Sequence, residues 1–177
     1  MTNYFELYEL PVSFHPDAVT VKNKFYELSK RYHPDRFAQA GEDQLAEAMQ
    51  LAATNNAAYK TLRSSDATMA YILRQNGLLE EEEKYALPPA FLMEMMELNE
   101  AISDYEDDPA NHTARKQAEQ DLSAQLETWE EVAGQLTDAF DPAMPDSALL
   151  LQVKDMYFRK KYLLRIKERI ATFAAHQ

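Results

Sequence analysis

The chain has 177 residues, 46% of them hydrophobic, a formal net charge of −12 at pH 7 and no cysteine. This length allows one domain or two small ones with real cores. The acidic balance argues against a nucleic-acid partner, and the lack of cysteine excludes disulfides, thiolate metal sites and a cysteine nucleophile. No apolar run approaches the roughly 20 residues that span a bilayer, so we expect a cytoplasmic protein with no membrane partner.

Only three glycines and an abundance of Ala, Leu, Glu, Gln and Lys predict an all-α protein. A short first helix is expected at residues 3 to 9, ending before Pro11. A second helix is expected from about Pro16 to Tyr32, because its apolar residues recur at steps of four, three and four. These residues are Val21, Phe25, Leu28 and Tyr32. They predict one buried face along the helix.

The tripeptide His-Pro-Asp occurs on both sides of the second helix. The copy His15-Pro16-Asp17 precedes the helix, where a proline in the first turn and a following acid are ordinary start signals. The copy His33-Pro34-Asp35 follows the helix, and its proline ends the helical pattern. We therefore expect the first copy to be structural and the second to expose an imidazole and a carboxylate on a rigid loop.

Basic residues gather around the second His-Pro-Asp copy. Lys22, Tyr26 and Lys30 are four residues apart and lie on the helix face turned away from the apolar residues. Arg31 and Arg36 flank the loop itself. The pattern predicts a local positive surface beside the loop, in a chain that is otherwise acidic.

A third helix is expected from about Asp43 to Leu62, with a row of apolar and small residues suited to lying antiparallel against the second helix. The row consists of Leu45, Ala48, Met49, Ala52, Asn56, Tyr59 and Leu62. We interpret Asn56 as a buried hydrogen-bonding residue and not as a ligand. The cluster Ser64-Ser65-Asp66 then predicts the start of a short fourth helix that ends at Asn76-Gly77.

A boundary between two domains is expected at residues 77–88, where an acidic run and Pro88 interrupt the helical pattern. The first domain then spans residues 1–76 and the second residues 89–177, with the boundary segment as a linker. From Gly77 onward the chain has 10 basic and 21 acidic residues, so nearly all of the net charge belongs to this part.

Three helices are expected in the second domain, at about 89–106, 110–138 and 146–175. The middle helix has a coiled-coil-like row made of Ala118, Leu122, Leu126, Trp129, Ala133, Leu136 and Phe140. The last helix has its own row at Leu149, Val153, Met156, Lys160, Leu163 and Ile170. The row is broken at Lys160, whose long stem can still lie along apolar surface. Lengthwise packing into a three-helix bundle would bury all of these rows.

The first of these helices has more apolar surface than its core row needs. The core row is Phe91, Met95, Leu98, Ile102 and Tyr105. Leu92, Met93 and Met96 point elsewhere, and the same side holds Glu97, Glu100 and Asp104. Phe158 falls on the side of the last helix opposite its own apolar row. An apolar strip rimmed by acids is typical of a partner surface, but a wider core would give the same pattern.

Residues 1 to about 76 resemble a J domain. The resemblance rests on three blocks in order: Tyr4-Phe5-Glu6-Leu7-Tyr8-Glu9-Leu10, Tyr32-His33-Pro34-Asp35-Arg36-Phe37 and Asn56-Ala57-Ala58-Tyr59-Lys60-Thr61-Leu62. J domains bind the DnaK type of ATP-driven chaperone and stimulate its ATPase. The resemblance implies an antiparallel helical hairpin with short helices, whose chaperone-binding residues are Lys22, Tyr26, Lys30, Arg31, His33, Pro34, Asp35 and Arg36.

A J domain followed by a compact acidic three-helix domain resembles the HscB family, co-chaperones of iron-sulfur cluster assembly. The block Ala90-Phe91-Leu92-Met93-Glu94-Met95-Met96-Glu97-Leu98 is similar to that family's second characteristic segment. The resemblance implies a chain that stimulates a dedicated DnaK-type chaperone, HscA, and delivers to it the cluster scaffold protein IscU. The implied scaffold-binding residues are Leu92, Met93, Met96, Glu97, Glu100, Asp104 and Phe158. The chain lacks the cysteine-rich N-terminal segment of many eukaryotic members, which favours the bacterial type.

An enzyme is not expected, because the chain has four histidines and none of the Gly-rich phosphate loops or nucleophile and zinc motifs of common enzymes. We expect no cofactor and no metal, since hydrolysis takes place on the chaperone and a cluster needs thiolate ligands. A J-domain adaptor for a different client protein is the alternative. The lack of a Gly/Phe-rich spacer and a zinc module argues against broad client handling.

Overall fold

The computed structural model describes residues 3–37, 39 and 41–175, and the regular structure of these residues is helical throughout. The chain divides into two compact units. The first unit comprises Met1–Gly77 and Phe140–Pro145, and the second comprises Leu78–Ala139 and Asp146–Gln177. The predicted all-α fold class is confirmed. Within the described part of the chain, no helix combines the length and the apolar character that crossing a membrane requires.

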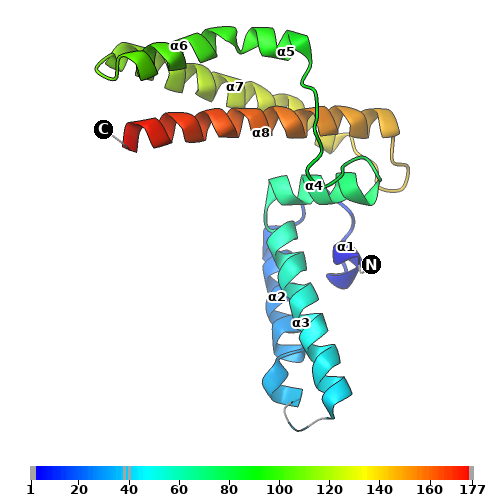
Figure 1. Cartoon of the computed structure of the whole chain (residues 1–177). Coiled ribbons are helices and arrows are strands. Elements are labelled where there is room, and N and C mark those ends of the chain that lie inside the picture. Colours follow the sequence, from blue (N-terminus) through cyan, green and yellow to red (C-terminus); the bar gives the residue numbers. More distant parts are fainter. Residues whose placement is uncertain (1–2, 38, 40, 176–177) are drawn as a thin grey trace. The chain divides into compact units, whose positions relative to one another are not determined.

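The first unit is built around an antiparallel helical hairpin (Figure 1). Its helices are α1 (Tyr4–Leu7), α2 (Ala18–Arg31), α3 (Glu42–Leu62) and α4 (Ser65–Gln75), with a 3-10 turn, η1 (Pro34–Phe37), after α2. The turn occupies the place where an irregular loop was expected. A proline at the first position of such a turn is favourable, because its fixed φ suits the turn and its missing N–H has no partner to lose.

The first His-Pro-Asp copy lies at the start of α2, as predicted, but the helix begins at Ala18, so Pro16 precedes the first turn and is not part of it. Asp17 precedes the helix, and its carboxylate accepts hydrogen bonds from the Thr20 backbone N–H at 2.7 Å and from the Thr20 hydroxyl at 2.6 Å. These hydrogen bonds hold the pKa of Asp17 below its ordinary value. At the other boundary predicted from capping residues, the Ser64 hydroxyl accepts from Ala67 N–H at the start of α4, and Gly77 follows that helix with a φ of +68°.

The prediction for Asn56 is wrong, because the buried amide belongs to Asn55. Asn55 is 1% exposed, whereas Asn56 is exposed, as is Met49. The Asn55 amide donates to Phe25 O at 3.1 Å and to Ser29 Oγ at 3.0 Å, and its side-chain oxygen accepts from Tyr8 Oη at 2.8 Å. This network joins Tyr8, which follows α1, to α2 and α3. Burial raises the pKa of the Tyr8 phenol, which therefore stays a neutral donor.

Phe140 was expected on the apolar row of the middle helix of the second domain. That helix ends at Asp138, and Phe140 packs in the first unit, where its ring meets Phe14 edge-on at a centroid distance of 5.0 Å. The segment Phe140–Pro145 therefore returns to the first unit before the chain continues into the last helix. The prediction included Phe140 because this residue keeps the spacing of the apolar row by chance, although it lies beyond the end of the helix.

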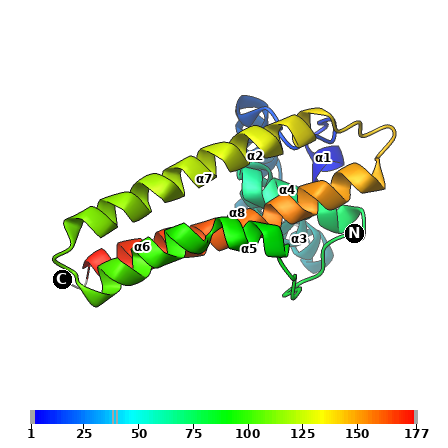
Figure 2. The ribbon, with the colours of Figure 1, turned by 90° about the horizontal axis from the view of Figure 1, so that it is seen from above.

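The second unit is a helical bundle in which the two longest helices, α7 and α8, lie side by side along their lengths (Figure 2). Its helices are α5 (Pro89–Glu94), α6 (Met96–Asp107), α7 (His112–Asp138) and α8 (Ser147–Ala175). The first predicted helix is thus interrupted at one residue, Met95, whose φ of −83° and ψ of −1° stay close to helical values. The predicted core row of Phe91, Met95, Leu98, Ile102 and Tyr105 is buried. On α8 the first buried leucine is Leu150 and not Leu149.

Residues 78–88, expected to be a linker, belong to the second unit and pack on α8. Leu79 is buried, and the Glu83 carboxylate pairs with Lys154 at 2.5 Å. The hydrogen bond from Lys154 lowers the pKa of Glu83. Tyr85 donates from its hydroxyl to Asp155 Oδ1 at 2.9 Å. The acidic composition of this segment therefore serves partly to bind the basic helix α8.

Candidate functional site

The second His-Pro-Asp copy lies at the exposed junction between α2 and η1. The side chains of His33 and Asp35 are 58% and 90% exposed. The Asp35 backbone N–H donates to His33 Nδ1 at 3.3 Å, which requires an unprotonated Nδ1, so the Nδ1–Asp35 Oδ2 separation of 3.6 Å is not an ion pair in that tautomer. The arrangement leaves His33 Nε2–H and both Asp35 oxygens available to a partner.

The other residues predicted to bind a chaperone surround this junction. Arg36 lies close to α2, because its Nη1 donates to the Lys30 carbonyl oxygen at 3.2 Å. The Arg31 guanidinium is 5.6 Å from the ring centroid of Tyr32. Lys22, Lys30 and Arg31 are exposed, and Tyr26 is 53% exposed, so a surface of mostly basic side chains extends along one side of α2. Exposure makes these residues accessible, and their binding role stays a prediction.

The residues predicted to bind a scaffold lie on α5, α6 and α8. Leu92, Met93 and Met96 are 43%, 69% and 64% exposed, so they are not part of a wider core. The acids Glu97, Glu100 and Asp104 are exposed on α6. An apolar strip rimmed by carboxylates is therefore present on this unit. Its binding partner stays a prediction.

Phe158 is half-buried, and sequence reasoning missed the residue that covers it. Tyr85 stacks on its ring at a centroid distance of 4.4 Å and an interplanar angle of 6°, while Tyr157 meets it edge-on at 5.2 Å. Burial and the hydrogen bond to Asp155 raise the pKa of Tyr85 to about 12. Tyr85 lies in the segment interpreted as a linker, and no periodic pattern marks it. Phe158 therefore offers only part of its ring to a partner.

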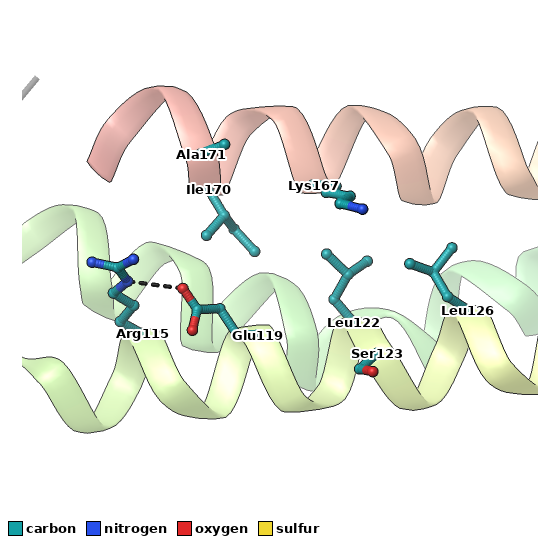
Figure 3. A pocket seen from close by; sticks show the side chains of 8 residues that line it. All are labelled: Arg115, Glu119, Leu122, Ser123, Leu126, Lys167, Ile170 and Ala171. Atoms are coloured by element: carbon teal, nitrogen blue, oxygen red, sulfur yellow. Dashed lines mark hydrogen bonds and ion pairs between the residues drawn. The ribbon is translucent and has the colours of Figure 1, made fainter. Parts of the chain in front are cut away.

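The unit that carries the strip also has a surface pocket of about 380 Å³ between α7 and α8 (Figure 3). Leu122, Leu126 and Ile170 point into it, and Arg115 pairs with Glu119 at 2.8 Å at one end. Ser123 lies on its edge, without a histidine in the lining that could act as its base. Across the described residues, no group of three or more His, Cys, Asp or Glu side chains is placed to hold a metal ion.

Comparison with known proteins matches residues 87–171 to the family described as "HSCB C-terminal oligomerisation domain". The co-chaperone protein HscB homolog of Vibrio campbellii is 42% identical over 106 residues, which are 59% of this chain and 62% of that protein. The match thus spans about three fifths of that relative's length. The homolog of Photobacterium profundum is 36% identical over 123 residues, which are 69% of this chain and 72% of that protein.

Similarity in three dimensions extends over nearly the whole chain. The solved structure of the chaperone HscB from Vibrio cholerae superposes with a TM-score of 0.70 at 28% sequence identity, covering 99% of both chains. That coverage includes both units, whereas the family match covers only residues 87–171.

Proposed function

Since this chain belongs to the HscB family of co-chaperones, we propose that it stimulates the ATPase of a dedicated DnaK-type chaperone, HscA, and delivers the scaffold protein IscU to it. The exposed junction around His33-Pro34-Asp35 contacts the chaperone. The apolar strip of Leu92, Met93 and Met96, with its acidic rim and Phe158, contacts the scaffold. The adaptor works in the cytoplasm and assists the maturation of iron-sulfur proteins.

The observation that carries this proposal is the exposure of three large apolar side chains on a helix whose core row is already filled. Met95 is fully buried, whereas Met96 next to it is 64% exposed. Exposed apolar residues that cluster beside acids, without a core to complete, favour a protein-binding surface. Methionine adapts to irregular partner surfaces, which suits such a contact.

The proposed mechanism needs no chemistry on this chain. Each of the two units binds one partner, so the scaffold and the chaperone are held on the same molecule. Tethering raises the effective concentration of each for the other, to the millimolar range for short connections. ATP hydrolysis takes place on the chaperone and the cluster stays on the scaffold, so this chain acts without cofactor, nucleotide or metal.

The two His-Pro-Asp copies provide a matched test of the chaperone contact. Asp35→Asn removes an exposed carboxylate charge, and we expect loss of ATPase stimulation with unchanged scaffold binding. Asp17→Asn makes the same change in the copy that caps α2, where asparagine is as good a cap as aspartate. We expect Asp17→Asn to stimulate like the parent chain. The measurement is steady-state ATP hydrolysis by the chaperone. Stimulation by Asp35→Asn equal to that of Asp17→Asn would remove the assigned role of the loop.

A further inference from the structure

Helices α6 and α8 are joined by two polar contacts, which show the direction and the register of one helix relative to the other. Asn99 Nδ2 donates to Tyr162 Oη at 2.9 Å, and Arg169 Nε donates to Glu106 Oε1 at 2.7 Å. Asn99 and Glu106 are seven residues apart, as are Tyr162 and Arg169. The two helices therefore run parallel, with the same residue spacing between contacts on each (Figure 2). We call the line through these two contacts the α6–α8 seam.

Helical geometry places three kinds of side chain in order across this seam. At about 100° per residue, Leu92 and Met96 lie within about 60° of Asn99 around the α5–α6 surface, whereas Glu100, Asp104 and Glu97 lie about 100–160° away, with Met93 among them at about 120°. On α8, the half-buried Phe158 and the exposed Arg165 lie about 40–60° from Tyr162. Lys161 lies about 100° and the exposed Glu168 about 120° away in the same direction. The order across the surface is thus a mainly basic flank on α8, then Phe158, Leu92 and Met96, and then the acids of α6 with Met93 among them.

The bases on the α8 side are not neutralised by the chain itself. Among the described residues, neither Lys161 nor Arg165 forms an ion pair. Lys161 Nζ lies 5.8 Å from the ring centroid of Phe158, and the Arg165 guanidinium carbon lies 5.9 Å from that of Tyr162. Both side chains are exposed.

Other bases of the same helix do have partners. Lys154 pairs with Glu83, Arg159 with Asp155, and Arg169 with Glu106. From Gly77 onward the chain has 21 acidic and 10 basic residues. Acidic residues are thus in excess, and their number does not explain why Lys161 and Arg165 form no ion pair. Like charges one turn apart on a helix repel mildly, and Lys161 and Arg165 stand in that relation.

We propose that Lys161 and Arg165 bind carboxylates of the scaffold and so form the second charged flank of its binding surface. This inference rests on the proposed function of the strip. A surface with bases on one side and acids on the other fits a partner patch that has acids, apolar side chains and bases in the matching order. Such a patch docks in one orientation, because the reversed orientation places like charges opposite each other.

The test is the affinity for IscU of the full chain with Lys161→Glu and Arg165→Glu combined, measured by isothermal titration calorimetry at low and high salt. We expect affinity about tenfold weaker at low salt and a shallower salt dependence, since two attractive contacts become repulsive. Lys167→Glu is the control, because Lys167 is exposed on the same helix but lines the pocket toward α7. We expect Lys167→Glu to bind like the parent chain.

The outcomes separate this inference from the proposed function. Parent-like affinity and salt dependence of the double variant would overturn the inference and leave the proposed function in place. Equal weakening by Lys167→Glu would also overturn it, because the effect would then reflect net charge alone. Failure of the parent chain to bind the scaffold would remove both. If charge reversal disturbs folding, Lys161→Gln with Arg165→Gln keeps long side chains and should still flatten the salt dependence.

Discussion

Met95 and Met96 are adjacent in sequence but occupy opposite environments, and replacing each by alanine separates binding from folding. Met95 is 0% exposed and belongs to the core cluster of the second unit, so Met95→Ala should lower the free energy of unfolding by about 2–5 kcal/mol. Met96 is 64% exposed, so Met96→Ala should change it by less than about 0.5 kcal/mol.

The binding effect of Met96→Ala follows from the area that is left to bury. Full burial of a methionine side chain contributes about 1.5–3 kcal/mol, and roughly two thirds of this side chain is still exposed, so docking can gain about 1–2 kcal/mol from it. The scaffold Kd should therefore rise about 5- to 30-fold. Urea unfolding measures the stability of both variants and calorimetry measures scaffold affinity. A destabilised Met96→Ala, or one with unchanged scaffold affinity, would refute the assignment of the strip.

Two further substitutions, the first with a matched control, test the polar contacts of the fold. Asn55→Ala should lower the free energy of unfolding by about 2–3 kcal/mol, because it removes a buried amide that hydrogen-bonds to Tyr8, Phe25 and Ser29 and leaves the Tyr8 hydroxyl only the backbone carbonyl of residue 55. The exposed Asn56→Ala should change the free energy of unfolding in urea by less than about 0.5 kcal/mol. The pKa of Glu83 is lowered in the fold by Lys154, so its stabilising contribution is present above pH 4.5 and is lost as pH falls below that value. Glu83→Gln should therefore flatten the acid limb of urea stability plotted against pH, and an unchanged limb would contradict the pairing.

The elements of the fold follow closely from periodicity and capping residues. Ser64 accepts the capping hydrogen bond that its cluster predicted, and Asp17, expected only as an acid in the first turn, lies just before α2 and caps it. The exposed strip was also visible in sequence, because Leu92 and Met96 depart from a core row that is already complete. These features are local, since they depend on residues within one helix and its ends.

The errors arise where a contact joins distant segments. Asn55 is buried on the same face of α3 as Ala48 and Leu62, from each of which it is seven residues away. Small residues beside this row also allow a row through Asn56, and spacing alone does not distinguish the two. Tyr85 lies in a stretch without periodicity, and only the folded chain brings it onto Phe158. Phe140 keeps the spacing of α7 but packs on Phe14 instead. None of these partners can be read from spacing alone.

The adaptor role itself is tested most directly by steady-state ATP hydrolysis of the dedicated chaperone, with this chain and the scaffold added singly and then together. We expect stimulation by both together to exceed the sum of the separate effects by a wide margin, because one molecule holds both partners. Stimulation by this chain that the scaffold leaves unchanged would contradict delivery of the scaffold, and would assign the apolar strip to a different client.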